Sequence, residues 1–253
     1  MTAIYVEITS TRGSAPRDAG TVMKVTQDGI EGTIGGGALE HQAIAKARAM
    51  LLAGEPAFAE TLPLGPSLGQ CCGGAVSLSY GVAPRPLDLV PMQVHRDARD
   101  PQHAEDLWLW GAGHVGRAVV AAAHPQAFRI TWVDDAPERF PAQVRSDVKT
   151  VPAADMPLLA TRAERQADHL IFTYSHDIDL ALCAALLKRD VRSIGVSGAE
   201  TKWARFAKRL RAMGLDPSSI ICPIGDKTLG KAPAQIANGV VQTLSPAPMK
   251  ARA

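Results

Sequence analysis

The stretch Leu107-Trp108-Leu109-Trp110-Gly111-Ala112-Gly113-His114-Val115-Gly116 decides the fold of this chain. Its first four residues are apolar, as in a buried strand, and glycines follow with the spacing G-x-G-x-x-G. Alone this spacing is weak evidence. Here it follows a strand and opens a helix expected over residues 115–123, which is the context of a dinucleotide-binding turn. Gly111 permits the tight turn, Gly113 lets a phosphate approach the backbone, and Gly116 lets helix and strand pack closely.

The residues after this turn alternate between strand and helix patterns. Apolar runs predict strands at 129–134, 169–174 and 191–196, and helical periodicity predicts helices at 177–188, 200–213 and 233–244. Such alternation predicts an α/β fold with a doubly wound, Rossmann-like parallel sheet and right-handed crossovers. In these folds the ligand binds outside the carboxyl ends of the strands. Five residues at those ends are candidate cofactor-binding residues: His114, Asp134, Ser175, His176 and Ser197.

Asp134 has a specific expected role, because it lies 23 positions after Gly111 and ends the next strand. An acidic side chain at that place can accept hydrogen bonds from ribose hydroxyls. The alternative is a Rossmann scaffold that has lost its ligand. A segment at 222–227 also leaves a strand end and belongs to the same expected crevice.

The first part of the chain predicts a small α+β domain over residues 1–83. Strands are expected at 4–9, 21–26, 30–34, 58–62 and 75–80, and a helix at 38–52. Residues 84–106 contain several prolines and many Asp, Arg and His residues without an apolar period, so they are interpreted as a linker. The Rossmann-like domain then occupies residues 107–253.

Two glycine-rich loops of the first domain are candidate anion sites. The turn at 13–17 presents Arg17, and Gly35, Gly36 and Gly37 run directly into the expected helix. Successive glycine amides at a helix start can bind an anion, and Arg17 can add a bidentate contact to phosphate. Plain turns explain each loop equally well.

Cys71 and Cys72 are adjacent within a loop rich in glycine. A disulfide between neighbouring residues is strained, so we interpret them as two free thiols, soft donors that suit zinc, copper or molybdenum. No C-x-x-C pair completes a zinc site. Cys183 lies in an apolar helix pattern and is expected to be core filler. With four cysteines and no disulfide framework, we expect a cytoplasmic protein.

The composition excludes some partners. The net charge is +2, with 27 basic and 25 acidic residues, which gives no electrostatic case for nucleic acid. No apolar stretch is long enough to span a membrane. A basic run at 202–211 falls at helical spacing and is interpreted as a solvated helix face that includes Lys202.

Taken together, five segments resemble the XdhC/CoxI family. They lie in the family's order at residues 12–17, 32–40, 69–74, 111–116 and 222–225, and the paired cysteines resemble the XdhC branch. The resemblance implies an accessory protein without turnover that binds molybdenum cofactor (Mo-molybdopterin) as cargo, works with a cysteine desulfurase, and delivers the cofactor to the molybdenum subunit of xanthine dehydrogenase. It also implies a homodimer, and makes Cys71 or Cys72 the residue nearest the molybdenum.

Two other interpretations stay open. One is an oxidoreductase that uses NAD(P), which the Rossmann half favours, although fold alone does not imply function. The chain has no Tyr-x-x-x-Lys pair, and His114 and His176 are the candidate catalytic groups on another scaffold. The other is a redox- or metal-responsive binding module that acts through Cys71 and Cys72.

Overall fold

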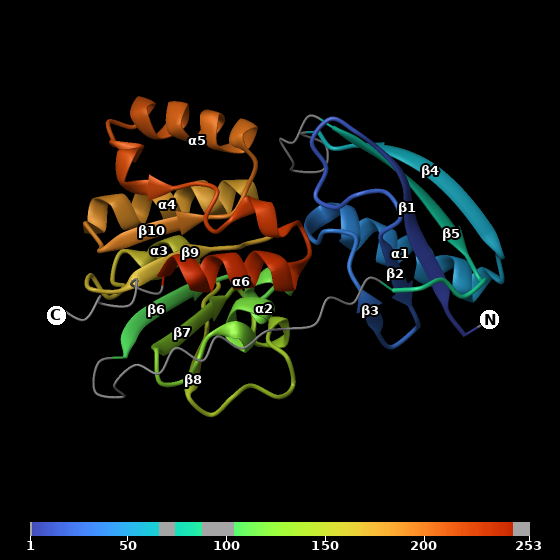
Figure 1. Cartoon of the computed structure of the whole chain (residues 1–253), viewed down its shortest axis with the longest axis horizontal. Helices are drawn as coiled ribbons and strands as arrows, with labels where there is room; N and C mark the ends of the chain where they lie inside the picture. Colours follow the sequence, from blue (N-terminus) through green and yellow to red (C-terminus); the bar gives the residue numbers. More distant parts are fainter. Residues whose placement is uncertain (1, 66–73, 88–103, 245–253) are drawn as a thin grey trace, which may run out of the picture. The chain divides into compact units, whose positions relative to one another are not determined.

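A computed structural model describes residues 2–65, 74–87 and 104–244 (Figure 1). The chain divides into two compact units. The first comprises the described residues up to 87 together with Tyr174–Asp177, and the second comprises the other described residues from 104 onward. Within these ranges no helix has the length and apolar character that crossing a lipid bilayer requires.

The first unit contains a five-stranded antiparallel sheet and one helix. The strand order is β3-β2-β1-β5-β4, so the first strand of the chain lies in the centre. The bounds are β1 Ile4–Arg12, β2 Val22–Val25, β3 Ile30–Gly32, β4 Ala57–Pro63 and β5 Ala75–Gly81, with α1 at Gly37–Ala53.

One face of this sheet packs against α1. Alternate residues of β1 and β5 are buried there, as expected for a sheet with one covered face. They form a core with the apolar stripe of α1, which includes Leu39, Ala43, Ala47 and Met50. Gly54 ends the helix in the left-handed conformation, as a C-cap glycine does. The predicted helix and strands of this domain are confirmed.

The second unit is a six-stranded parallel sheet in the order β11-β10-β9-β6-β7-β8. In chain order this is the 3-2-1-4-5-6 pattern of a doubly wound fold, which confirms the predicted fold class. The strands are β6 Glu105–Trp110, β7 Phe128–Asp134, β8 Val148–Pro152, β9 Asp168–Ile171, β10 Ser193–Val196 and β11 Ile220–Ile221.

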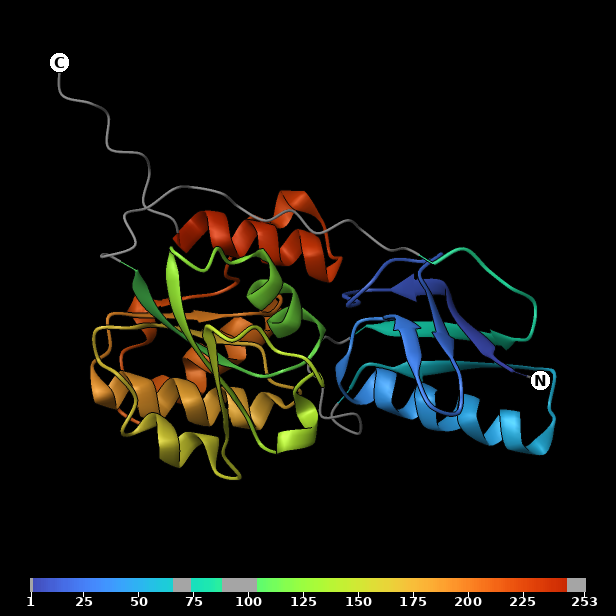
Figure 2. The same ribbon diagram turned by 90° about the horizontal axis from the view of Figure 1, so that it is seen from below.

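Helices cover both faces of this sheet (Figures 1 and 2). On one face, α2 (His114–Ala122) and α6 (Pro233–Leu244) pack together over a core that contains Leu109 and Trp132. The other face carries α3 (Met156–Ala160), α4 (His176–Arg189) and α5 (Glu200–Ala212) over a core that contains Trp110 and Ile171.

The structure adds elements that the sequence patterns did not predict. These are β8, α3 and β11, together with short 3-10 turns at Pro137–Arg139, Pro217–Ser219 and Lys227–Leu229. Each has five residues or fewer, which is too short for a helical or strand periodicity of apolar residues to be recognised. In addition β6 begins at Glu105, so Asp106 belongs to the sheet and not to the expected linker.

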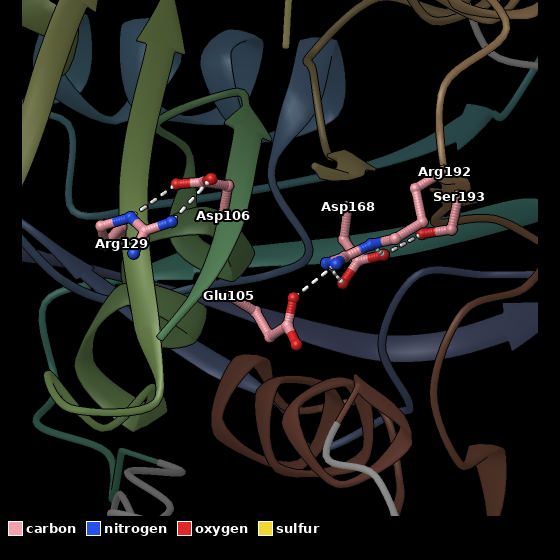
Figure 3. A network of polar contacts seen from close by, with 6 residues as sticks. All are labelled: Glu105, Asp106, Arg129, Asp168, Arg192 and Ser193. Atoms are coloured by element: carbon pink, nitrogen blue, oxygen red, sulfur yellow. Dashed lines mark hydrogen bonds and ion pairs between the residues drawn. The ribbon is translucent and has the colours of Figure 1, made fainter. Parts of the chain in front are cut away.

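Ion pairs join the strands at their amino ends (Figure 3). Arg129 of β7 makes two bonds of 2.8 Å to Asp106 of β6. Arg192, which precedes β10, binds Asp168 of β9 through two nitrogens at 3.1 and 2.7 Å, and also pairs with Glu105. This ion-pair cluster holds the starts of four strands and leaves the opposite, carboxyl edge to the loops that follow.

Candidate functional site

The glycine turn after β6 lies at the point where the strand order reverses. Gly111 has φ 115°, and a Cβ atom there would lie 2.5 Å from the carbonyl oxygen of Phe172, just beyond the end of β9. A Cβ on Gly116 would overlap the carbonyl oxygen of Gly111. Both positions therefore require glycine for close packing, as the sequence predicted.

Gly113 differs from these two glycines. It is exposed, and a Cβ built on it would meet no atom within 4 Å. It is the N-cap of α2, and as a glycine it has no side chain of its own that could cap the helix. The start of α2 therefore presents backbone to open space, together with the positive end of the helix dipole. This arrangement suits an anion, while phosphate binding itself stays a prediction.

Two side chains hold the glycine turn from either side. The carboxylate of Asp134 accepts a hydrogen bond of 2.5 Å from the amide of Ala112. The guanidinium of Arg117 donates to the carbonyl oxygen of Ala112 at 2.9 Å and to that of Arg139 at 2.7 Å. Both polar groups of Ala112 are thus engaged, so the turn is preorganised. Sequence reasoning missed Arg117, whose only signal is its position one turn into α2.

The side chain of Asp134 binds the backbone of the glycine turn and is almost completely shielded from solvent. It is 4% exposed, and its other oxygen accepts from the amide of Asp135 at 2.7 Å. Burial raises the pKa of this carboxyl above its usual range, although the two backbone hydrogen bonds oppose the shift. Contact with a ribose stays a prediction, and the role shown by these contacts is to fix the glycine turn.

The loops after β9 and β10 leave the same edge of the sheet. Ser175 and His176 follow β9, Ser197 follows β10, and all three are half-buried. Just beneath them, Lys202 of α5 pairs with Asp179 of α4 at 2.6 Å, and its side chain is buried. The prediction that Lys202 lies on a solvated face is therefore wrong, because its ammonium has found a buried carboxylate.

The segment after β11 also reaches this edge. The amide of Ile224 donates to the carbonyl oxygen of Val196, at the end of β10, at 3.1 Å. Gly225 has φ 89° and packs closely against Gly239 and Val240 of α6. The segment after β11 therefore lies beside the end of β10, at the edge where the glycine turn follows β6.

In the first unit, two glycine motifs pack against the turn that carries Arg17. A Cβ on Gly35 would lie 2.5 Å from the Cβ of Pro16, which places the second glycine loop on the turn that precedes Arg17. A Cβ on Gly74 would lie 2.6 Å from the carbonyl oxygen of Arg12 and would overlap that of Ser14. Arg17 itself is 4% exposed.

The glycine loop before α1 already holds a carboxylate of the chain itself. One oxygen of Glu40 accepts hydrogen bonds from the amides of Ile34 and Gly36 at 3.0 and 3.2 Å, and from the hydroxyl of Thr33. The amide of Gly35 donates to that hydroxyl at 3.0 Å. The predicted external anion at Gly35, Gly36 and Gly37 therefore has an internal competitor, which sequence reasoning missed.

The cysteines fall into different environments. Cys71 and Cys72 lie outside the described residues, and Gly74 is the second residue after them in the sequence. Cys183 is confirmed as a core residue, and its burial raises the pKa of the thiol. Within the described ranges, no group of three or more His, Cys, Asp or Glu residues is placed to hold a metal ion.

Two family models match this chain. Residues 107–243 match the model described as the XdhC Rossmann domain, and residues 2–62 match that of the XdhC and CoxI family. An Escherichia coli K12 protein described as uncharacterized protein YqeB is 24% identical over 245 residues. This match covers 93% of the chain but only 41% of that protein, so the chain spans less than half of this relative.

Solved structures also resemble the chain. A crystal structure described as a xanthine dehydrogenase from Bacillus halodurans has 17% sequence identity and a TM-score of 0.48, and the match covers 96% of this chain and 90% of that one. A Rossmann-fold NAD(P)-binding family protein from Shigella flexneri has 19% identity and a TM-score of 0.35, over 45% of this chain and 64% of that one.

Proposed function

Because the chain belongs to the XdhC and CoxI family, we propose that it is an accessory protein that binds molybdenum cofactor and assists its insertion into xanthine dehydrogenase. It protects the sulfurated form of the cofactor between a cysteine desulfurase and the molybdenum subunit of the target enzyme. It acts as a homodimer in the cytoplasm, where free thiols persist. Such a carrier needs a reversible site and a partner surface, and no turnover of its own.

The observation that carries this proposal is the meeting of three loops in the first unit. The glycine loop at 32–37 and Gly74 each pack against residues 12–16, through contacts that a Cβ atom on Gly35 or Gly74 would block. These segments are separate in the sequence, and their contacts with one turn bring the glycine motifs of the first unit close to Arg17. In the proposal Cys71 or Cys72 supplies a sulfur ligand to the molybdenum of the cargo.

The second unit supplies anion recognition in this proposal. The open start of α2 at Gly113 accepts the phosphate of the pterin, since backbone amides and the helix dipole favour negative charge. The bonds from Asp134 and Arg117 to Ala112 keep this turn in one conformation before the cofactor arrives. A preformed turn reduces the ordering cost of binding.

The direct test is to identify what copurifies with the protein. The chain is produced in a host supplied with molybdate, and bound pterin is oxidised and measured by fluorescence. Cys71→Ala and Cys72→Ala are compared with Cys183→Ala, which removes a buried thiol of the core. We expect one of the first two changes to weaken cofactor retention at least tenfold, about 1.4 kcal/mol, while Cys183→Ala retains it. Full retention by both Cys71→Ala and Cys72→Ala would remove these thiols from the mechanism.

The alternative function is that of an NAD(P)-dependent oxidoreductase. The strand order and the glycine turn at the reversal point favour it, because dinucleotides bind there in doubly wound folds. Measurements on one preparation of the protein can distinguish the two functions. Absence of pterin, together with micromolar binding of NADH and turnover of a substrate, would support the oxidoreductase.

A further inference from the structure

A buried ion pair lies beneath the loops at the carboxyl edge of the second unit. Lys202 of α5 is 5% exposed and Asp179 of α4 is fully buried. The ammonium of Lys202 lies 2.6 Å from one carboxylate oxygen of Asp179 and donates to the carbonyl oxygen of Ser197 at 2.8 Å. The other oxygen of Asp179 accepts from the hydroxyl and the amide of Thr173, at 2.6 and 3.2 Å.

This network joins the ends of two neighbouring strands. Thr173 lies just after β9 and Ser197 just after β10, so each strand end is bonded to one member of the pair. The aliphatic part of Lys202 also lies directly under Gly198, where a Cβ atom would be 2.6 Å from its Cδ. Gly198 has φ 153°, which a side chain would disfavour. Lys202 thus fixes both the carbonyl and the backbone path of this loop.

A gain in stability does not by itself explain why a buried ion pair is present here. Taking two charges out of water costs several kcal/mol per ion, and replacing a buried pair by neutral residues of similar volume is often neutral or stabilising. The pair instead restricts the local geometry. An ammonium and a carboxylate with fixed partners allow few arrangements of the backbone groups that are bonded to them.

We propose that Lys202 and Asp179 are positioning residues for the ligand site at this edge. They fix the backbone at Thr173 and Ser197, at the ends of β9 and β10, so that this edge meets a phosphate-bearing ligand in one arrangement. The inference rests on the proposed function for the identity of that ligand. It does not require the pair to touch the ligand, because the pair acts through the strand ends.

The test variant is the double substitution Lys202→Met with Asp179→Asn. Lys202→Met alone would leave a buried carboxylate without its partner, which is strongly destabilising. In the double variant the Asn carbonyl still accepts from Thr173, and the Met side chain fills the space of the lysine stem. The variant loses the bond to Ser197, the bond between the two side chains and both charges, but leaves no unpaired charge in the core, so the fold should survive.

A matched control exists at the other end of the same two strands. Arg192 and Asp168 join the starts of β10 and β9 within the ion-pair cluster of Figure 3. The double variant Arg192→Met with Asp168→Asn removes that pair. We expect the Lys202/Asp179 variant to retain at least tenfold less pterin than the wild type, and the control variant to retain as much as the wild type. Equal retention in all three proteins would overturn the proposal.

A second measurement separates this inference from the proposed function. Amide hydrogen exchange is followed at residues 197–199 without any ligand. We expect exchange there to be at least tenfold faster in the Lys202/Asp179 variant, with unchanged exchange within β9 and β10, and no such change in the control. If the wild type carries no pterin, the proposed function fails, while loop exchange still decides the positioning role. Unaltered exchange at 197–199 would refute it.

Discussion

The buried histidine of β9 should make the stability of the second unit depend on pH. His169 is fully buried; its Nδ1 lies 3.3 Å from the indole nitrogen of Trp110, and its Nε2 lies 2.9 Å from the carbonyl oxygen of Glu164. An indole N–H can only donate, so Nδ1 accepts and the proton resides on Nε2. The ring is therefore neutral, and burial lowers its pKa to about 4.

The sign and size of the effect follow from proton linkage. The pKa of His169 is about 4 in the folded state and about 6.5 in the unfolded chain, so the unfolded state binds the proton more tightly. The stability from the neutral ring is fully present above pH 6.5 or so and is lost as the pH falls towards 4. Between pH 7 and pH 5 these two values give a loss of about 2 kcal/mol from this residue.

Tryptophan fluorescence provides the assay, because all four tryptophans, at positions 108, 110, 132 and 203, belong to the second unit. Urea unfolding is measured at both pH values for the wild type and for His169→Gln, whose amide can accept and donate without titrating. The free energy of unfolding of the wild type, relative to the variant, should fall by about 2 kcal/mol. A difference that does not change with pH would refute the neutral buried ring.

Three further substitutions test the packing of the two glycine loops. Gly116→Ala should destabilise the second unit by about 3 kcal/mol, because its Cβ would overlap the carbonyl of Gly111; an unchanged urea midpoint of tryptophan fluorescence would contradict this contact. Glu40→Ala removes the acceptor of three donors and should cost about 3 kcal/mol, with faster amide exchange at residues 34–36 as its signature. Arg117→Met should lower stability by only about 1 kcal/mol but weaken pterin retention, and full retention would show that the Ala112 bond is not needed.

The fold was predictable from the sequence wherever a pattern ran long enough. The expected bounds of α6 agree with the structure, and those of α1 differ by one residue at each end, because both helices carry an apolar stripe over three turns or more. In contrast β11 has two residues, and β8 is an edge strand with one buried position. Their pairing depends on strands already placed, which local sequence does not encode.

The candidate site was predictable in its backbone and less so in its side chains. The glycine spacing located the turn after β6, because backbone segments that approach each other closely leave no room for a side chain. The partners of Arg117, Glu40 and Lys202 depend on which segments meet in the fold. Lys202 shows this clearly, because it lies in a basic run whose spacing is typical of a solvated face, yet Asp179 comes from another helix.

The two glycine loops resemble each other in sequence, but they differ in what their amides already bind. At the start of α1 the carboxylate of Glu40 accepts from two loop amides, so an incoming anion would have to displace charge-assisted bonds of about 1.5–3 kcal/mol each. At the start of α2, Gly113 is exposed, and a Cβ atom built there would meet no atom within 4 Å. If the chain carries a phosphate-bearing cofactor, its phosphate should therefore bind at α2. In the first unit, by contrast, the carboxylate of Glu40 already accepts from the loop amides that an anion would otherwise use.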